Sequence, residues 1–316
     1  MSISIALATY NGEKYIRNQL DSIISQSYTD FELIICDDNS SDTTIDIIKS
    51  YQEKDNRISL HLNKSNIGFL KNFEKALSLC KGDYIACCDQ DDIWEPNHLE
   101  VLYNNIGKND CIGADALLVD ADLTSLNKTH SQSMDVHIIP NTNIQLFNRE
   151  CFYNLIQGTA CLFSKRLLQY IIPFPKGIKF HDHWIALNAC IHNGCKYKPQ
   201  KILLYRCHSQ NITGYKEFKL LHALQTIRQA SKFRATIYQH NLAMLQAILP
   251  YITDKNQQNI AKDAIIFFKN LAENKKRFSS TLFYIKKYES ITLCPRRKWK
   301  LFFYRVLCVL LFGIMQ

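Results

Sequence analysis

The sequence predicts an α/β fold in which a mostly parallel sheet is flanked by helices and followed by a helical C-terminal region. Short apolar runs alternate with segments of helical period up to about residue 115. The 316 residues are 47% hydrophobic, enough to bury the core of one catalytic domain with an appendage. After about residue 215 the pattern becomes helical to the end.

The elements of the first part can be placed in order. Apolar runs with strand character predict strands at residues 3–9, 32–36, 58–62 and 84–88. Apolar positions on one helical face predict two helices, the first carrying Ile16, Leu20, Ile23 and Ile24 and the second Phe69, Phe73, Ala76, Leu77 and Cys80. Pro96 suits a first helical position, so a further helix is expected to begin there.

The second part is less regular. Residues 120–150 are polar and weakly periodic, and we expect a functional or mobile loop there. Structure should resume with a strand at 159–163, a helix that opens near His181 and a strand around 202–205. We therefore expect a catalytic domain at residues 1–215 and a helical C-terminal region at residues 216–316.

Composition narrows the class of protein. The first residues do not show the order typical of a secretory signal, which is a positively charged start, then an apolar stretch, then small residues. We therefore expect a cytosolic protein without a secretory signal. The twelve cysteines form no Cys-x-x-Cys pair and suit buried, reduced thiols rather than disulfides or a zinc site. The net charge of +9 is concentrated after residue 270, where ten Lys and Arg face two Glu, a balance of +8. This asymmetry indicates a basic tail that meets an anionic surface, and it argues against a nucleic-acid-binding face.

Polar residues follow three predicted strands, at positions 9–12, 37–42 and 89–92. Ligands of open α/β sheets bind at the carboxyl ends of the strands, so these segments should share one crevice. Carboxylates that converge there repel one another unless a cation compensates, and Asp89-Gln90-Asp91-Asp92 suits Mg²⁺ or Mn²⁺ on phosphate oxygens. Asp92 can equally cap the next helix, and Asp37-Asp38 can be turn chemistry before a helix.

Five stretches in order resemble the family 2 glycosyltransferases, which are inverting enzymes with the GT-A fold. They are residues 8–12 (Ala-Thr-Tyr-Asn-Gly), 26–42, Asn66-Ile67-Gly68, residues 81–84 (Lys-Gly-Asp-Tyr) and 89–92. The likeness covers roughly residues 1–215, and it implies a Rossmann-like GT-A domain that binds a nucleotide-sugar.

The resemblance also implies roles for the nucleotide side. Asp38 matches the carboxylate that accepts the N3–H of a uracil or thymine ring, with Thr9 and Tyr10 in the same pocket. Asp89 and Asp91 match the family's Asp-x-Asp, whose first residue faces the ribose and whose last binds the metal on the diphosphate. The remaining residues expected near the nucleotide are Asn11, Asn66, Gly68 and Lys71.

The segment Phe180-His181-Asp182-His183-Trp184 resembles the one in which the family keeps its catalytic base. An inverting transfer needs a carboxylate beside the acceptor hydroxyl, and Asp182 is the candidate. His181 stands where an acidic residue often does, which departs from the family's common Glu-Asp pair. A structural alternative is that His181-Asp182 caps the helix that follows.

Later residues complete the implied site. His208 resembles an imidazole that completes the metal shell or meets the diphosphate, although a lone histidine can also be structural. Arg206 would stabilise the departing diphosphate together with a Mn²⁺ or Mg²⁺ ion. Gly158 and Thr159 resemble a stretch that faces the donor sugar and acceptor, and Trp184 is expected on the acceptor side.

The C-terminal tail carries a separate signal. Residues 306–315 are an uninterrupted apolar run, shorter than the roughly 20 residues that span a bilayer. Residues 296–305 interleave Lys and Arg with Trp, Phe and Tyr, which is typical of a segment at an anionic membrane surface. We expect a peripheral anchor on the inner face of the cell membrane and a saccharide or lipid-linked saccharide acceptor. The alternative is a helix packed on the domain or at a dimer contact.

Other functions fit the sequence less well. A sugar nucleotidyltransferase generally has a Gly-rich, basic loop after its first strand, whereas Asn11-Gly12-Glu13 has a single Gly. A phosphoacceptor regulatory module would explain Asp37-Asp38 but not the later carboxylates, and a non-catalytic sugar-binding relative would not need all of them. The stretches around Asp182 and His208 look most like bacterial rhamnosyltransferase-type enzymes, which suggests dTDP-rhamnose or a UDP-hexose as donor in surface polysaccharide synthesis.

Overall fold

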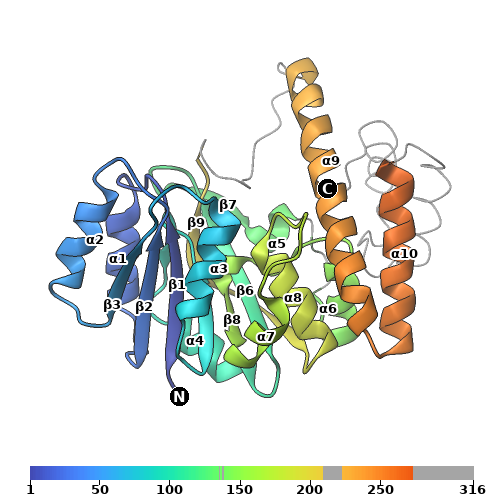
Figure 1. Cartoon of the computed structure of the whole chain (residues 1–316), viewed down its shortest axis with the longest axis horizontal. Helices are drawn as coiled ribbons and strands as arrows, with labels where there is room; N and C mark the ends of the chain where they lie inside the picture. The colour runs from blue at the N-terminus through green and yellow to red at the C-terminus, as the bar shows by residue number, and fades with distance from the viewer. Residues whose placement is uncertain (135, 137–138, 209–222, 273–316) are drawn as a thin grey trace.

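A computed structural model describes residues 1–134, 136, 139–208 and 223–272 of the chain. Nine strands of the described residues form one sheet, in the order β3-β2-β1-β4-β8-β6-β9-β5 with β7 paired to β6 (Figure 1). The strands run from the chain's start in the order β1 (Ile3–Thr9), β2 (Phe31–Asp37), β3 (Ile58–Leu62), β4 (Tyr84–Cys88), β5 (Ile93–Trp94), β6 (Cys111–Val119), β7 (Ser125–Thr129), β8 (Cys161–Ser164) and β9 (Cys195–Arg206).

The first four neighbours, β3, β2, β1 and β4, are all parallel. β8 runs antiparallel to both β4 and β6, and β6 is parallel to β9. Because parallel strands end at the same edge of the sheet, the loops after β1, β2 and β4 lie side by side.

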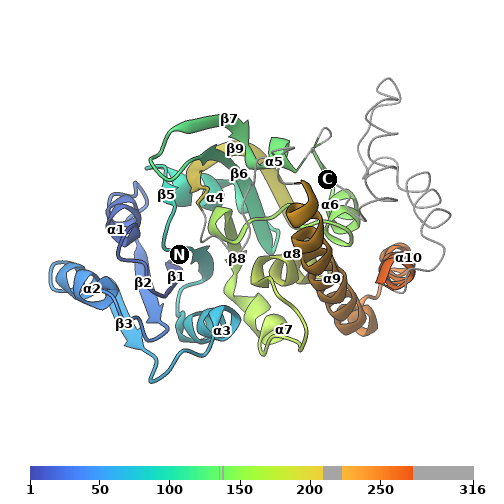
Figure 2. The ribbon, with the colours of Figure 1, turned by 90° about the horizontal axis from the view of Figure 1, so that it is seen from above.

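Alternating side chains divide the strands between two cores. Ile3, Ile5 and Leu7 of β1 belong to the core shared with α1 (Ile16–Ile24), α2 (Thr44–Gln52) and α4 (His98–Ile106). Ala6 faces the other core, which includes α3 (Phe69–Leu79), α6 (Asn143–Glu150), α7 (Leu168–Ile171) and α8 (His181–Ile191). Figure 2 shows α1 and α3 on opposite sides of β1. The predicted sheet with helices on both faces is confirmed.

The fourth helix begins at His98 rather than at Pro96, so that prediction was wrong. Ile93 and Trp94 pair with β9, and the backbone N–H of Glu95 donates to the carbonyl of Ile202 at 2.9 Å. Pairing with β9 keeps the chain extended up to this point, and the helix starts only after it.

Residues 120–150 contain more structure than the sequence indicated. The strand β7 folds back on β6, and α5 (His130–Ser133) follows it with a capping box from Thr129 and Gln132. The Asp115 carboxylate on β6 accepts from the N–H and hydroxyl of Ser131, at 3.0 and 2.5 Å, and so fastens α5 to the sheet. The expected strand at 159–163 begins as a 3₁₀ turn at Gly158–Ala160 and becomes β8 at Cys161.

The C-terminal region is helical as far as it is described. α9 (Ala223–Ile248) and α10 (Lys255–Ala272) lie at the end of the molecule opposite α2 (Figure 1). Met244 and Leu245 of α9 and Phe267 and Phe268 of α10 are buried in the same core as α6 and α8. Among the described helices, none combines the length and the apolar character that crossing a bilayer requires. The basic and apolar tail, residues 296–316, lies outside the described residues.

Candidate active site

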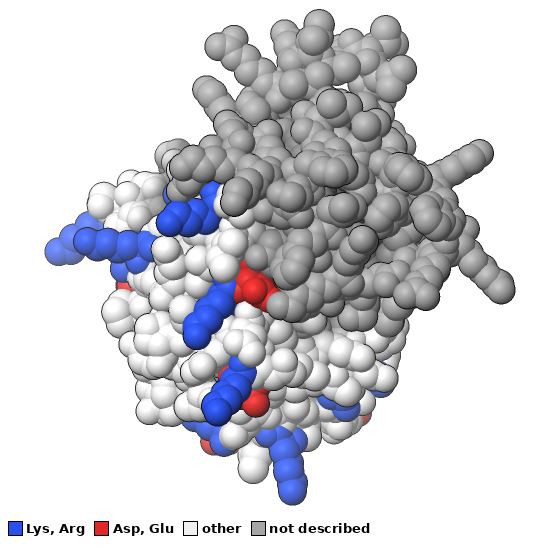
Figure 3. Space-filling model, turned by 90° about the vertical axis from the view of Figure 1, so that its right-hand side faces the viewer, with Lys and Arg blue, Asp and Glu red and all other residues white. Residues whose placement is uncertain are grey.

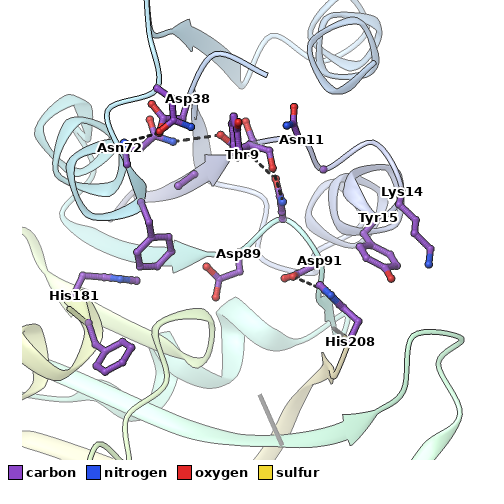
Figure 4. A pocket seen from close by; sticks show the side chains of 18 of the residues that line it. Thr9, Asn11, Lys14, Tyr15, Asp38, Asn72, Asp89, Asp91, His181 and His208 are labelled. Atoms are coloured by element: carbon purple, nitrogen blue, oxygen red, sulfur yellow. Dashed lines mark hydrogen bonds and ion pairs between the residues drawn. The ribbon is translucent and has the colours of Figure 1, made fainter. Parts of the chain in front are cut away.

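A cavity of about 550 Å³ opens at the carboxyl ends of β1, β2 and β4, where the sequence predicts a ligand crevice. The predicted site residues that line it are Thr9, Tyr10, Asn11, Asp38, Asn66, Gly68, Asp89, Asp91, Asp182 and His208. Figure 4 shows Asp89 near the middle, with His181 on one side of it and Asp91 and His208 on the other. Residues from six separate segments of the chain therefore meet in one cavity.

The Asp38 end of the cavity is built by the loop before α3. The Asp38 carboxylate accepts from the backbone N–H groups of Ile67 and Gly68 and from the amide of Asn63, each at 2.8 Å. Gly68 has a φ of +89°, a conformation that favours glycine. Of these donors only Gly68 binds Oδ2, and a carboxylate oxygen has two lone pairs. Asp38 is thus held in place and keeps an acceptor position.

The neighbouring Asp37 ties two loops together. Its carboxylate is buried and accepts from the hydroxyl of Thr9 at 2.8 Å and from the N–H and hydroxyl of Ser40 at 2.8 and 2.6 Å. Asp37 does not line the cavity, whereas Asp38 does. The turn interpretation therefore describes Asp37, and the site interpretation describes Asp38.

The loop after β4 is joined to the loop after β1 by the amide of Gln90. Tyr10 donates its N–H to Oε1 of Gln90 at 2.9 Å, and Nε2 of Gln90 donates to the Tyr10 carbonyl at 3.1 Å. A Cβ at Gly12 would collide with this amide. Asn11 has a φ of +46° and donates its N–H to the Ser40 hydroxyl at 2.9 Å. These bonds fix the rim and leave the Tyr10 ring 47% exposed.

Asp91 and His208 are in contact on one side of the cavity. Nε2 of His208 lies 2.8 Å from Oδ2 of Asp91. Burial, followed by the negative charges of Asp91 and Asp182, raises the pKa of Asp89 to about 8. A cation at this place would favour the ionised form of all three carboxylates.

Tyr15 supports the His208 side of the cavity. Its ring stacks on the imidazole of His208 with centroids 4.8 Å apart, and the Arg206 guanidinium lies 4.6 Å from its centroid. Nζ of Lys14 lies 5.0 Å from the same centroid. Arg206 donates from Nε to the backbone carbonyl of Asp91 at 2.8 Å. It is buried and does not line the cavity, so it holds the Asp91 loop from behind while positive charge gathers at this end.

Asp182 lies in the first turn of α8, and its side chain lines the cavity. Its Oδ2 accepts from the N–H of Gly158 at 3.1 Å, and its Oδ1 accepts from the N–H of His183 at 2.8 Å. The second bond satisfies an N–H in the first turn of the helix. The residue before the helix is Phe180 and no side chain makes a capping bond, so the interpretation of His181-Asp182 as the helix cap was wrong. One carboxylate therefore bonds within the first turn and faces the cavity.

A chain of hydrogen bonds behind Asp182 joins α8 to α9 and α6. The N–H of Lys179 donates to Nδ1 of His240 at 3.0 Å, so Nε2 of His240 carries the proton that bonds Nδ1 of His183 at 3.1 Å. Nε2 of His183 then donates to the Glu150 carbonyl at 2.5 Å. Burial, then the neighbouring His183 and Lys179, lowers the pKa of His240 to about 2. This series of hydrogen bonds forms with both imidazole rings neutral.

Five predicted site residues do not line the cavity. Lys71 forms a 2.6 Å ion pair with Glu74 on the exposed side of α3. The Thr159 hydroxyl accepts from the indole of Trp94 at 3.3 Å. Trp184 is buried in the core and donates to the Ile171 carbonyl at 3.0 Å. Gly158 and Arg206 lie behind Asp182 and Asp91, which they contact through hydrogen bonds.

The contact between Asp91 and His208 joins an imidazole to a carboxylate, and carboxylate oxygens are the ligands that Mg²⁺ and Mn²⁺ prefer. Within residues 1–134, 136, 139–208 and 223–272, no group of three or more His, Cys, Asp or Glu side chains could hold a metal ion. The pair is therefore at most part of a ligand set.

Several lining residues were not predicted from the sequence. Asn72 lies on the buried face of α3 and donates to the Cys36 carbonyl at 2.7 Å. A polar residue among Phe73 and Ala76 on an apolar helical face was a usable signal. Lys14 and Tyr15 carry no such signal, since they follow a loop whose path the sequence does not define.

Comparisons with known proteins place this geometry in a family. A model described as glycosyl transferase family 2 matches residues 4–171. An uncharacterized glycosyltransferase of Haemophilus influenzae is 25% identical over 218 residues, which are 67% of each chain. The putative teichuronic acid biosynthesis glycosyltransferase TuaG of Bacillus subtilis is 37% identical over 98 residues, 31% of this chain and 39% of TuaG. The chain thus spans well under half of TuaG.

Solved structures agree in fold. Residues 1–349 of Staphylococcus aureus TarS in complex with UDP-GlcNAc give a TM-score of 0.62 at 20% identity, covering 85% of this chain and 72% of that one. The mannosyltransferase PcManGT from Pyrobaculum calidifontis, in complex with GDP-Man and Mn²⁺, gives 0.54 at 14% identity, covering 98% and 86%. The predicted GT-A fold is confirmed.

Proposed function

The chain belongs to glycosyl transferase family 2, and on that premise we propose that it moves a sugar from a nucleoside-diphosphate donor to a saccharide hydroxyl with inversion and with a divalent metal. The observation that carries the proposal is the convergence of Asp38, Asp89, Asp91 and Asp182 in one cavity at the strand ends. We further propose that residues 1–215 carry the catalytic site and that residues 216–316 form an accessory helical region.

The nucleotide is proposed to bind at the Asp38 end. The acceptor position left on Asp38 suits the N3–H of a uracil or thymine ring, and the exposed ring of Tyr10 lies nearby on the cavity wall. Thr9, Asn11, Asn66 and Gly68 complete this end. Lys71 and Trp184 are left out of the proposed site because they do not line the cavity.

The transfer itself is proposed to depend on Asp182. Its carboxylate takes the proton of the acceptor hydroxyl as that oxygen bonds to the anomeric carbon, and the bond from this carbon to the diphosphate oxygen breaks on the opposite face. The N–H of Gly158 holds the carboxylate in position through its 3.1 Å bond. One displacement of this kind inverts the anomeric centre and forms no covalent sugar–enzyme intermediate.

The departing diphosphate is proposed to lie toward Asp89, Asp91 and His208. These residues would hold Mn²⁺ or Mg²⁺, which supplies positive charge to the leaving group when bound. Lys14 adds a cation on the cavity wall, and Arg206 contributes from behind the Asp91 loop. Gly158 and Thr159 act through Asp182 and the neighbouring core rather than by direct contact.

Donor and acceptor follow from weaker signals. The stretches around Asp182 and His208 suggest dTDP-rhamnose or a UDP-hexose, and similarity to TuaG favours an acceptor in bacterial surface polysaccharide synthesis. The test is a panel of donors: purified protein is incubated with Mn²⁺ or Mg²⁺ and with dTDP-rhamnose or one of the common UDP-sugars. Release of the nucleoside diphosphate and thermal stabilisation of the protein are measured for each donor. Selective, chelator-sensitive stabilisation by one donor supports the proposal. If the protein binds none of the donors and neither UDP nor dTDP, the proposal is overturned.

We also propose a peripheral position on the inner face of the cell membrane, through residues 296–316 and toward a lipid-linked acceptor. Lys and Arg are spread over the described part of the face that Figure 3 shows rather than gathered there. The concentrated basic charge lies in the sequence after residue 270. Deletion of residues 296–316 should release the protein from anionic vesicles in a flotation assay, and continued flotation would contradict the proposal.

A further inference from the structure

His181 lines the cavity next to Asp182, and its polar atoms are unused. The side chain is only 3% exposed, and neither Nδ1 nor Nε2 has a hydrogen-bond partner among the described residues. Buried polar atoms in native proteins are nearly always paired with protein, water or ligand. An imidazole with two buried and unpartnered nitrogens at a cavity wall therefore points to a ligand group.

The surroundings of His181 hold its ring in one orientation. It stacks on Phe73 with centroids 4.0 Å apart and planes at 18°, and Phe69 lies 5.4 Å away at 59°. A Cβ at Gly158 would lie 2.8 Å from Nε2. Glycine at this position therefore leaves room for the imidazole, which comes close to the Gly158 backbone. These contacts fix the ring and use neither of its nitrogens.

The charge around His181 indicates which ligand group fits. Burial lowers its pKa, so near neutral pH the ring is uncharged and offers one N–H donor and one acceptor. Asp182 is the adjacent charged side chain, whereas Lys14 and His208 stand with Tyr15 on the other side of Asp89 (Figure 4). A neutral imidazole that both donates and accepts hydrogen bonds beside the Asp182 carboxylate suits hydroxyl groups of a ligand. A carboxylate or phosphate group on the ligand is disfavoured there.

The position of His181 indicates which part of the substrate it meets. In the proposed reaction the diphosphate lies toward Asp91 and the base Asp182 acts on the far side of the anomeric carbon. The sugar must then lie between Asp89 and the start of α8. His181 faces this space from the residue before Asp182.

Resting on the glycosyltransferase function proposed above, we propose that His181 is a specificity-determining residue that hydrogen-bonds hydroxyl groups of the donor's sugar, and that this sugar is neutral rather than a uronic acid. Asp182 remains the base, and His181 takes no proton in the reaction.

The test compares binding of the bare nucleotide with binding of the sugar nucleotide. Isothermal titration with Mn²⁺ measures the affinities for UDP and dTDP and for UDP-glucose, UDP-N-acetylglucosamine, dTDP-rhamnose and UDP-glucuronate. His181→Phe keeps the stack on Phe73 and removes both nitrogens, and His181→Leu is the second variant if the first does not fold. We expect the affinity for the best sugar nucleotide to fall roughly tenfold or more, with that for its bare nucleotide changed less than about twofold.

His98 supplies a matched control. It is also buried, stacks on Trp94 at 3.9 Å and has an Nε2 without a partner among the described residues, yet it does not line the cavity. His98→Phe should change thermal stability and leave the ratio of sugar-nucleotide to bare-nucleotide affinity as in the wild type. The same selective loss in His98→Phe would show that the effect comes from packing, and it would overturn the proposal.

The remaining outcomes separate this inference from the proposed function. An unchanged ratio in whichever His181 variant folds overturns the role of His181. The role of His181 is also overturned if the wild-type protein binds no sugar nucleotide more tightly than its bare nucleotide. Preference for UDP-glucuronate would overturn the proposal that the sugar is neutral. A wild-type protein that binds neither UDP nor dTDP removes the glycosyltransferase mechanism, and this inference with it.

Discussion

The two ends of the cavity differ in how their polar groups are satisfied. At the nucleotide end, the carboxylates of Asp37 and Asp38 and the amide of Gln90 all bond to neighbouring loops. Toward α8, His181 on the cavity wall holds two buried nitrogens without a hydrogen-bond partner among the described residues, and Glu150 and Gln157, which do not line the cavity, each hold one such oxygen. The first end is preformed, so little ordering should be needed when a nucleotide binds. At the second end, the His181 imidazole can complete its hydrogen bonds only with substrate or water.

The largest expected effect separates chemistry at the second end from binding at the first. Asp182→Asn keeps the shape of the carboxylate and the bond from Gly158 but cannot accept the acceptor's proton. We expect turnover to fall by roughly 10²–10⁴-fold, with UDP or dTDP affinity retained. Product formation under saturating donor measures the loss. Asp46→Asn, an exposed change on α2, is the control, and equal turnover in the two variants would reject Asp182 as the base.

A second pair of variants tests the preformed end itself. Asp38→Ala removes the carboxylate that accepts hydrogen bonds from two backbone N–H groups and, in our proposal, from the N3–H of the uracil or thymine ring. Nucleotide affinity should therefore fall about tenfold or more. Asp37 does not line the cavity, and Asp37→Ala breaks its bonds to Thr9 and Ser40. This variant should cost about 2 kcal/mol of stability, with nucleotide affinity of the folded fraction kept. Calorimetry and urea unfolding measure the two quantities. If Asp37→Ala loses more affinity, the division between the two residues is wrong.

The pH dependence of stability probes the region behind the second end. His240 is buried with a pKa near 2, whereas an unfolded histidine titrates near 6.5. Below pH 6.5 the unfolded state therefore takes up the proton first, and stability present above that pH is lost as the pH falls. One such group contributes about 1.4 kcal/mol per pH unit. Urea unfolding should approach this slope as the pH falls below 6.5, and His240→Gln should reduce it. An unaltered slope would remove His240 from the explanation.

The smallest effect concerns the rim. A Cβ at Gly12 would displace the amide of Gln90, a flexible side chain that can move at the expense of its two bonds to Tyr10. Gly12→Ala should therefore weaken nucleotide binding only a few-fold, about 1 kcal/mol. Gln90→Ala should have a similar effect, and the double variant should be little worse than either single one. Additive losses would show that Gly12 acts without Gln90.

The first end could be predicted from the sequence because its signals are local. A strand with alternating or continuous apolar residues followed at once by Asp, Asn or Gly sets both the element and its polar end, as in β2 followed by Asp38. The second end depends on contacts between distant residues. The bond between His183 and His240 joins positions 57 apart, and no pattern in either segment announces it.

Two expectations on α8 and α4 failed for related reasons. Almost every residue of α8 is buried, so the sequence does not tell which face meets the cavity, and Trp184 lies in the core rather than on its wall. Pro96 is compatible with a helix start, but pairing with β9 overrides that local preference. In both cases tertiary contacts decided what the local sequence left open.

The hydrogen bond from α9 to α8 also bears on when the enzyme becomes active during synthesis. Once the ribosome has released residue 208, all the described residues that line the cavity have been made, including Asp182. The imidazole that sets the tautomer of His183, and the buried residues of α9 and α10 beside it, are translated later. We therefore expect a nascent chain that stops near residue 215 to hold its nucleotide loops in place with the base-bearing helix still unsupported. Transfer of sugar from the nucleotide donor would then begin only after α9 and α10 have been made.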